Sequence, residues 1–385
     1  MREVAVLGIG ATPVEEQWEK SLRELAGEAS LAAMQDAGLD TIQSIFIGNM
    51  MSGSANHQQH LGVYLADWLD MRFAEGLRVE AACSSGAAAF RSALMAVASG
   101  EVDTALSVAV EKMTDSPSTE ITAELATAAD ADWETDQGLS FVALNALVMQ
   151  RYMYEHHWQH DDFANFSINA HANGVHNPNA RFRKPITIET YRKSPIVADP
   201  ITVMDASPMG DGAAAAILVP VEALRRYGVT QTIQVIGSGA ATDSIAVHGR
   251  KDPTWLTAAE RSAKQAYQQA GCTPKDMDLF EAHDAFTIMA TLSLEASGFA
   301  ERGQGVRLAL DEEIRPNGRI PIATRGGLKA RGHPVGATGM YQIIEVVQQL
   351  RGQAGENQIA DARIGMAQNI GGSGSNIITH ILKSA

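Results

Sequence analysis

Short apolar runs alternate with alanine-rich amphipathic stretches along the chain, and this alternation occurs twice. The first round opens with Val6-Leu7-Gly8-Ile9-Gly10-Ala11-Thr12 and the second with Val235-Ile236-Gly237-Ser238-Gly239-Ala240-Ala241-Thr242. In each round a strand-like run leads into a helix-like stretch, a second strand-like run and a glycine-rich turn that opens another helix. The order predicts two similar α/β halves, residues 1–220 and 221–385.

The pattern changes between roughly residues 116 and 200. Aromatic, histidine and asparagine residues become frequent, as in Arg151-Tyr152-Met153-Tyr154-Glu155-His156-His157-Trp158. We expect helical segments and long loops inserted into the first half, and an insertion of this size usually covers or shapes a site.

The composition narrows the class of protein. The 385 residues are 45% hydrophobic and 19% charged, which is ordinary for a soluble globular enzyme and excludes a disordered chain. The net charge of −15 disfavours nucleic-acid binding. No run approaches the roughly 18 apolar residues of a membrane helix, and the N-terminal residues show no basic signal-peptide region. We expect a cytoplasmic protein that binds neither nucleic acids nor membranes.

The chain has two cysteines, Cys83 and Cys272, too few for a disulfide framework or a cysteine-rich metal site. Cys83 directly precedes a predicted helix from Ser84 to about Ser99, which Gly100 ends. A helix N-terminus favours a thiolate, so Cys83 is a candidate nucleophile. Cys272 lies just past a predicted helix end and is interpreted as a packing residue.

Two histidines stand in distinctive surroundings. His283 lies in Glu281-Ala282-His283-Asp284-Ala285-Phe286, and His333 lies in the glycine-dense Gly332-His333-Pro334-Val335-Gly336-Ala337-Thr338-Gly339. The chain closes with Asn369-Ile370-Gly371-Gly372-Ser373-Gly374. Together with the Cys83 run, these motifs occur in the order seen in thiolases, and the chain resembles the sterol-carrier-type branch and its archaeal and bacterial acetoacetyl-CoA thiolase relatives.

The resemblance covers essentially the whole chain and implies the duplicated five-layer α/β/α/β/α thiolase fold in a homodimer or homotetramer. It implies an acyl-CoA C-acetyltransferase, in particular an acetoacetyl-CoA thiolase, that runs ping-pong Claisen condensation or its reverse. Coenzyme A thioesters would be substrates, with no permanently bound cofactor and no metal. Archaeal relatives assemble with 3-hydroxy-3-methylglutaryl-CoA synthase and a small zinc-ribbon/OB-fold protein, so the resemblance allows similar partners.

The same resemblance implies a role for each site residue. Cys83 accepts the acyl group, and His333 takes the thiol proton and points at a thioester oxygen. His283 joins His333 in the oxyanion hole for the enolate of the second acyl group. Backbone N–H groups of Cys83 and Gly371 form the hole for the tetrahedral intermediate, where glycine leaves room for the thioester.

One departure from the family concerns the second cysteine that usually moves the α-proton. Its two family positions are Asn369 and Ala285 in this chain, and neither side chain can shuttle a proton at neutral pH. One hypothesis is that His283 moves the proton itself. A second departure is Arg325, which either contacts substrate or is solvated at a loop edge.

Coenzyme A is polyanionic, so an acidic protein needs a local basic patch to hold it. Arg181, Arg183 and Lys184 in the inserted region are candidates, although an exposed, solubilising loop is the competing interpretation for each. His156, His157 and His160 lack the partners of a metal site. Gly8-x-Gly10 lacks the third glycine of a dinucleotide fingerprint, which excludes nucleotide redox binding.

Three other functions compete with that of a thiolase. Cys83, His283 and His333 also resemble the Cys-His-His set of decarboxylating ketoacyl synthases, and malonyl-CoA turnover would favour that class. A thiolase-fold scaffold subunit of an acyl-transfer complex would show no iodoacetamide-sensitive activity by itself. The thiolase-like aldolases of steroid side-chain breakdown are disfavoured because Cys83 would have no role in them.

The proposed basic patch can be tested directly. Reversing Arg183 and Lys184 to glutamate should raise the KM for acetyl-CoA several-fold, because two favourable charges near the phosphates become unfavourable. Steady-state kinetics measure the change, and an unaltered KM would remove these residues from the binding site.

Overall fold

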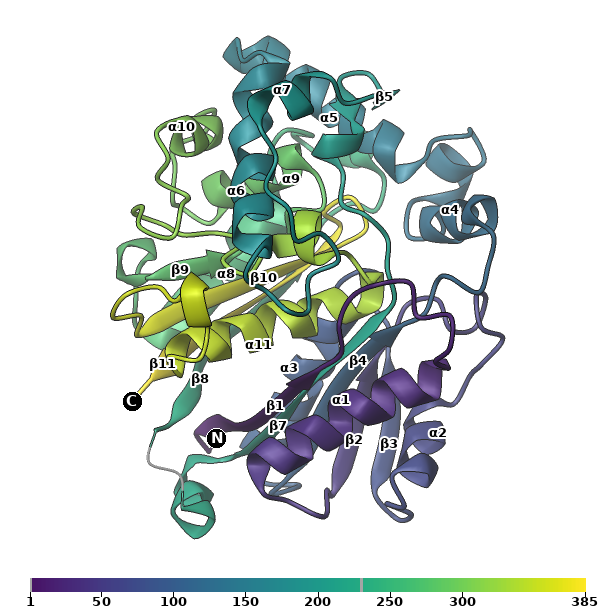
Figure 1. Cartoon of the computed structure of the whole chain (residues 1–385), viewed down its shortest axis with the longest axis vertical. Coiled ribbons are helices and arrows are strands. Elements are labelled where there is room, and N and C mark those ends of the chain that lie inside the picture. The colour runs from purple at the N-terminus through teal and green to yellow at the C-terminus, as the bar shows by residue number, and fades with distance from the viewer. Residues whose placement is uncertain (1, 229–230) are drawn as a thin grey trace.

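The two halves share one nine-stranded sheet in the computed structural model, which describes residues 2–228 and 231–385 (Figure 1). The strand order is β3-β2-β4-β7-β1-β8-β11-β10-β9. The first half contributes β1 (Val4–Ala11), β2 (Ser44–Gly48), β3 (Glu75–Val79), β4 (Ala105–Glu111) and β7 (Gly212–Pro220). The second half contributes β8 (Ile233–Thr242), β9 (Leu279–Glu281), β10 (Ile364–Gly371) and β11 (Asn376–Ser384). The halves meet where β1 pairs briefly with β8, and the predicted division at residues 220 and 221 lies just after β7.

Helices form three layers around the two half-sheets. Helices α1 (Leu22–Ala37) and α2 (Leu61–Trp68) pack on the first half-sheet, and α8 (Thr257–Ala270) packs on the second beside α9 (Thr287–Ala296). Helices α3 (Ser85–Ser99) and α11 (Thr338–Leu350) contact each other between the half-sheets. This is the predicted five-layer α/β/α/β/α architecture. No helix in the described ranges is long and apolar enough to cross a membrane.

The glycines of the internal repeat explain how α1 and α8 pack. A Cβ atom on Gly10 would lie 2.3 Å from the carbonyl oxygen of Ala29 in α1, and one on Gly239 would lie 2.0 Å from that of Ser262 in α8. Gly8 and Gly237 face the same two helices in the same way. Because the contacts are with backbone atoms, which cannot rotate away, each half needs glycine at these strand positions.

The strand registers show that the two halves have equivalent residues near the site. Gly48 of β2 lies opposite Ala109 of β4, and Glu281 of β9 lies opposite Ala367 of β10. Two residues further along β4 and β10 are Glu111 and Asn369, which therefore occupy corresponding positions in the two halves. Both side chains are buried next to the glycine-rich turn and first turn of α11.

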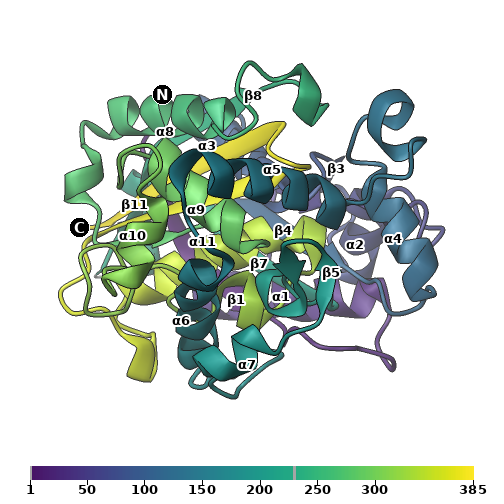
Figure 2. The ribbon, with the colours of Figure 1, turned by 90° about the horizontal axis from the view of Figure 1, so that it is seen from above.

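The chain between β4 and β7 forms a largely helical region above the second half. It contains α4 (Ser118–Ala126), α5 (Phe141–His156), α6 (Ala164–Gly174), α7 (Ile188–Arg192) and the short strands β5 (Ile196–Ala198) and β6 (Ile201–Thr202). Figure 2 shows α5, α6 and α7 on the side facing the viewer, and α5 and α6 contact α9. Asp205 anchors the region, since its buried carboxylate accepts hydrogen bonds from Thr287 and His160 at 2.7 Å each.

The packing of α8 gives a stability prediction. Gly239→Ala should lower the free energy of unfolding by about 1–3 kcal/mol, because the new methyl group meets backbone atoms of α8. Gln268→Ala, on the exposed face of the same helix, is the control and should change it by no more than about 0.5 kcal/mol. Urea unfolding followed by circular dichroism measures both, and equal midpoints would contradict the packing argument.

Candidate active site

Cys83 lies in a tight turn between β3 and the start of α3. The residue before it, Ala82, has a φ of +51°, a left-handed conformation that a non-glycine residue seldom adopts. Ser84 Oγ donates to the carbonyl of Ala81 at 2.6 Å, and Ser85 Oγ donates to the carbonyl of Ala82 at 2.6 Å. The two serines therefore brace the turn that projects the sulfur.

His333 is held in one tautomer by the first turn of α11. Its Nδ1 lies 2.7 Å from Thr338 Oγ1, and that hydroxyl donates its own hydrogen to the carbonyl of Pro334 at 3.3 Å. Thr338 must then accept from His333, which places the hydrogen on Nδ1 and leaves Nε2 with a free lone pair. His333 is thus arranged to accept a proton.

His283 has the opposite arrangement. Asn369 Nδ2 donates to His283 Nδ1 at 2.9 Å, so the hydrogen of the neutral ring is on Nε2. The two imidazoles face each other edge to face, with ring centroids 5.2 Å apart and planes at 85°. One ring can therefore accept a proton while the other donates a hydrogen bond.

Cys83, His283 and His333 line one cavity of about 380 Å³. The remaining walls are mainly apolar and come from the inserted region, the loop before α9 and the turn before α11; they include Leu125, Phe141, Val142, Val197, Phe286 and Met289. Val197 is 54% exposed, which locates part of the cavity mouth at β5. A dry, apolar cavity strengthens every electrostatic interaction inside it.

Burial keeps all three reactive groups neutral in the resting protein. It raises the pKa of the Cys83 thiol to about 12, and the carboxylate of Glu111 acts in the same direction. Burial lowers the pKa of His333 to about 3 and holds the pKa of His283 well below its usual value. The expectation that the helix N-terminus would favour a thiolate is corrected here, because desolvation outweighs the favourable N–H groups. The sulfur therefore carries its proton in the resting protein.

The backbone donors near the sulfur differ from the predicted pair by one residue. The N–H groups of Cys83 and Gly372 face the thiol, and Gly372 lines the cavity. Gly371 instead ends β10, where a Cβ atom would lie 2.5 Å from the carbonyl oxygen of Ala81 and 2.7 Å from Ser84 Oγ. Gly371 therefore lets β10 approach the nucleophile turn, and the role of its N–H as a donor to the oxyanion stays a prediction.

Arg325 and Arg331 are buried structural cations behind the site. Arg325 donates to the carbonyl of Ala354 at 2.9 Å and to Asn177 Oδ1 at 3.1 Å, so it neither contacts the cavity nor lies in solvent. Arg331 forms an ion pair with Glu345 at 2.9 Å, and its positive charge contributes to the low pKa of both His283 and His333.

The predicted basic patch lies outside the catalytic cavity. Arg181 pairs with Glu16 at 2.7 Å and lines a separate groove of about 570 Å³. Arg183 and Lys184 are exposed and do not line the cavity. Among the described residues, no group of three or more His, Cys, Asp or Glu side chains could hold a metal ion.

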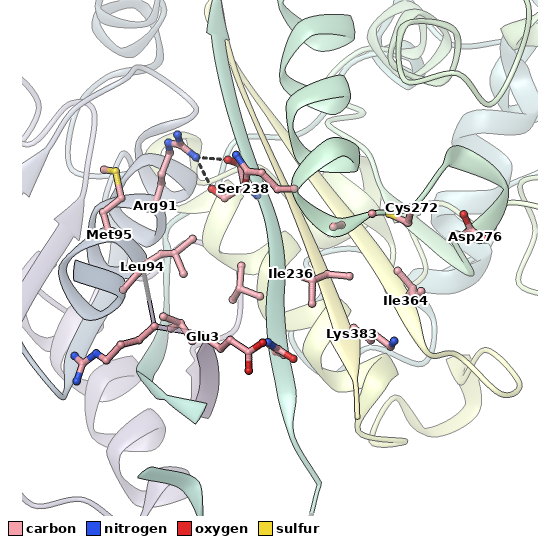
Figure 3. Close-up of a pocket in the computed structure, with 18 residues that line it drawn as sticks. Glu3, Arg91, Leu94, Met95, Ile236, Ser238, Cys272, Asp276, Ile364 and Lys383 are labelled. Atoms are coloured by element: carbon pink, nitrogen blue, oxygen red, sulfur yellow. Dashed lines mark hydrogen bonds between the residues drawn. The ribbon is translucent and has the colours of Figure 1, made fainter. Parts of the chain in front are cut away.

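A larger groove of about 860 Å³ lies between α3 and β8 (Figure 3). Arg91 crosses from α3 to bond Ser238 Oγ of β8 at 2.6 Å, and Cys272 lies at the far side. None of Cys83, His283 and His333 lines it. The chemistry therefore belongs to the smaller, more enclosed cavity.

Sequence reasoning did not find the partners that orient the histidines. Thr338 and Asn369 stand in the quoted motifs, but only the folded chain brings their side chains to the rings. Asn369 occupies one family position of the missing cysteine, and its polar side chain beside a glycine-rich turn is the signal that the sequence offers.

Comparisons with known proteins agree with this geometry. Residues 4–222 match the model of the thiolase N-terminal domain, and residues 239–384 match that of the thiolase C-terminal domain-like family. The acetyl-CoA acetyltransferase of Methanothermobacter thermautotrophicus is 43% identical, with 99% of each chain covered. Human sterol carrier protein 2 is 28% identical over 98% of this chain and 72% of its own length.

Solved structures show the same fold. An Ltp2-ChsH2(DUF35) aldolase superposes with a TM-score of 0.86 at 24% identity, covering 99% of this chain and 98% of that one. The acetyl-CoA acetyltransferase of Syntrophomonas wolfei has a TM-score of 0.77 at 18% identity, covering 100% and 99%. The fold and the relatives define an acyltransferase. The chain belongs to the thiolase family.

The hydrogen bond from Asn369 makes a specific prediction for His283. As a donor to an oxyanion, His283 should be partly replaceable: His283→Ala should lower Claisen turnover by about 10²–10³-fold, and His283→Asn by less, because the amide still donates. Acylation of Cys83 should persist in both variants, as measured by mass spectrometry. Equal loss of turnover in both variants would instead support His283 as the base that moves the α-proton.

Proposed function

We propose that this acyltransferase is an acetyl-CoA C-acetyltransferase of the acetoacetyl-CoA thiolase type that works through acetyl-Cys83. The observation that carries the proposal is one apolar cavity in which Cys83 meets two neutral imidazoles, one with a free Nε2 lone pair and one with an Nε2 hydrogen. A transferase of this kind needs a nucleophile, a base and an oxyanion donor, and these three side chains supply them.

In the first half-reaction the sulfur of Cys83 attacks the thioester carbonyl while its proton passes to Nε2 of His333. The N–H groups of Cys83 and Gly372 bind the oxyanion of the tetrahedral intermediate. The intermediate collapses, the bond to the coenzyme A sulfur breaks, and that thiolate takes the proton from His333. The products are acetyl-Cys83 and free coenzyme A, with His333 neutral again.

In the second half-reaction a further acetyl-CoA loses its α-proton to Nε2 of His333. The enolate oxygen accepts a hydrogen bond from Nε2 of His283, and the enolate carbon attacks the acetyl carbonyl on Cys83. As the C–S bond breaks, the Cys83 thiolate takes the proton from His333, and acetoacetyl-CoA leaves. His333 serves as the base in both halves, so this scheme needs no second cysteine at Ala285 or Asn369.

The phosphates of coenzyme A would lie outside the cavity mouth, beside cations of the inserted region. Lys193 is exposed and follows α7, directly before β5 and its mouth residue Val197. Arg183 and Lys184 are exposed on the same inserted region. Arg261→Glu and Lys264→Glu, on the exposed face of α8, are the matched control for the charge reversal at Arg183 and Lys184.

We also propose that the chain forms a homodimer or homotetramer and binds a small zinc-ribbon/OB-fold protein, with 3-hydroxy-3-methylglutaryl-CoA synthase as a further partner. The edge strand β3 supports self-association, because it pairs on one side only and Leu77 is 47% exposed. The name of the Ltp2-ChsH2(DUF35) aldolase, which has the same fold, includes a second component. A cytoplasmic location stays a prediction.

A decarboxylating condensation is the second candidate. It would form the enolate by loss of carbon dioxide and would need no α-proton transfer, which fits the alanine and asparagine at positions 285 and 369. Malonyl-CoA would then replace acetyl-CoA as the nucleophile donor.

Brief exposure of the protein to acetyl-CoA, followed by intact-mass and peptide mass spectrometry, tests the proposal. We expect one acetyl group on Cys83, none after His333→Ala, and formation of acetoacetyl-CoA without carbon dioxide. Cys272→Ala should acetylate normally and serves as the control. Absence of acetyl-Cys83 in the wild-type protein would exclude the proposed mechanism, and condensation with malonyl-CoA alone would favour the decarboxylating alternative.

A further inference from the structure

Glu111, at the end of β4, is fully buried and takes no part in the steps above. Its carboxylate accepts four hydrogen bonds: from Asn49 Nδ2 at 2.9 Å, and from the backbone N–H groups of Met50, Met51 and Gly336 at 2.9, 3.0 and 3.0 Å. All four partners donate, so the arrangement suits the ionised carboxylate. A buried charge with four dedicated donors indicates a function beyond packing.

Three of the donors belong to the loop that follows β2. This loop underlies the nucleophile turn: a Cβ atom on Gly48 would lie 2.6 Å from the carbonyl oxygen of Ser85, and Met51 packs in the small apolar cluster that contains Cys83. Arg78 holds the same loop from outside, with Nη2 donating to the carbonyl of Met50 at 2.8 Å. The position of Glu111 is therefore coupled to that of Cys83.

The fourth donor belongs to the turn that carries His333. Gly336 approaches so closely that a Cβ atom there would lie 2.4 Å from Glu111 Oε2 and 2.7 Å from the Met50 nitrogen. One carboxylate thus bonds both the loop after β2 and a turn that lies 225 residues beyond Glu111 in sequence. Because this carboxylate hydrogen-bonds both the loop after β2 and the His333 turn, shortening or neutralising it should let the two turns move apart.

We propose that Glu111 is a positioning residue that fixes the His333 turn against the nucleophile turn and, by its charge, keeps Cys83 a neutral thiol until His333 removes the proton. The second effect follows from proximity: the carboxylate bonds the N–H groups of Met51 and Gly336, and Met51 packs in the same small apolar cluster as Cys83. A fixed anion disfavours a second anion beside it. Glu111 is among the causes that raise the pKa of Cys83, and burial raises its own pKa to about 7 against the lowering effect of its N–H donors and Arg78. The role in turnover rests on the proposed function, whereas the effect on the thiol does not.

The two proposed effects of Glu111 change different measurements in opposite directions: the alkylation rate of Cys83 should rise while kcat falls. A merely structural role would not raise the alkylation rate. Glu111→Gln removes the charge, so alkylation of Cys83 by iodoacetamide at fixed pH should become about tenfold faster or more. The same variant should lower kcat by about 10²-fold, because the sulfur and imidazole are no longer held in register. The KM for acetyl-CoA should change little, since Glu111 does not line the cavity.

Glu111→Asp keeps the charge but cannot reach all four donors, so kcat should fall while alkylation stays at the wild-type rate. Glu80→Gln is the matched control, because it removes another carboxylate near the sulfur, does not contact Gly336, and leaves an amide oxygen that can still accept from the N–H of Ala82, so kcat should persist. Thermal unfolding is measured for each variant, and its alkylation is compared with that of the wild-type protein. All variants are made in Cys272→Ala, so that only Cys83 can be alkylated. If Glu111→Gln does not fold, Glu111→Asp decides the positioning role, and the rate of Cys83 alkylation in Glu111→Ala decides the electrostatic one.

Wild-type kcat in either Glu111 variant overturns the positioning role, and unchanged or slower alkylation in folded Glu111→Gln overturns the electrostatic one. If the wild-type protein forms no acetyl-Cys83, the proposed function fails, but the alkylation results still decide how Glu111 acts on the thiol.

Discussion

The N-termini of α3 and α11 meet so closely that neither position at the contact has space for a side chain. A Cβ atom on Gly86 would lie 2.9 Å from the carbonyl oxygen of Gly336, and one on Gly339 would lie 2.6 Å from the nitrogen of Ala87. Cys83 lies two residues before the first residue of α3, and His333 lies five residues before the first residue of α11. This backbone-to-backbone contact therefore brings the sulfur of Cys83 and the imidazole of His333 to one cavity. The contact requires glycine in the turns of both halves, because a side chain there would meet backbone atoms.

The two halves have similar elements in similar places, but equivalent positions in them hold different side chains. Corresponding strands, helices and turns place Glu111 and Asn369 at equivalent positions, yet the first holds the His333 turn and the second orients His283. A symmetric frame thus carries an asymmetric site. The inserted region closes it from one side, and Asp205 ties that region to the start of α9.

Desolvation explains why the site needs such close positioning. The same burial that strengthens hydrogen bonds to an oxyanion makes both the thiolate and the imidazolium costly. Charge separation is tolerable only when proton transfer and bond formation occur together, so atoms misplaced by an ångström would cost much of the rate.

The amino-acid sequence by itself determined the two halves, the extent of α3 with its stop at Gly100 and the order of Cys83, His283 and His333, because strand and helix periods and glycine-bearing turns are local properties. The five-layer class followed from the resemblance of its motifs to those of thiolases. Only the tertiary structure decided which atoms meet. It placed the N–H of Gly372 beside the sulfur, buried Arg325 away from the cavity and gave the histidines opposite tautomers through Thr338 and Asn369. The tertiary structure also buries Cys83, and this burial makes the resting side chain a neutral thiol and not the expected thiolate. Hydrogen-bond partners and solvent exclusion depend on segments far apart in the chain, and no local pattern encodes their distance.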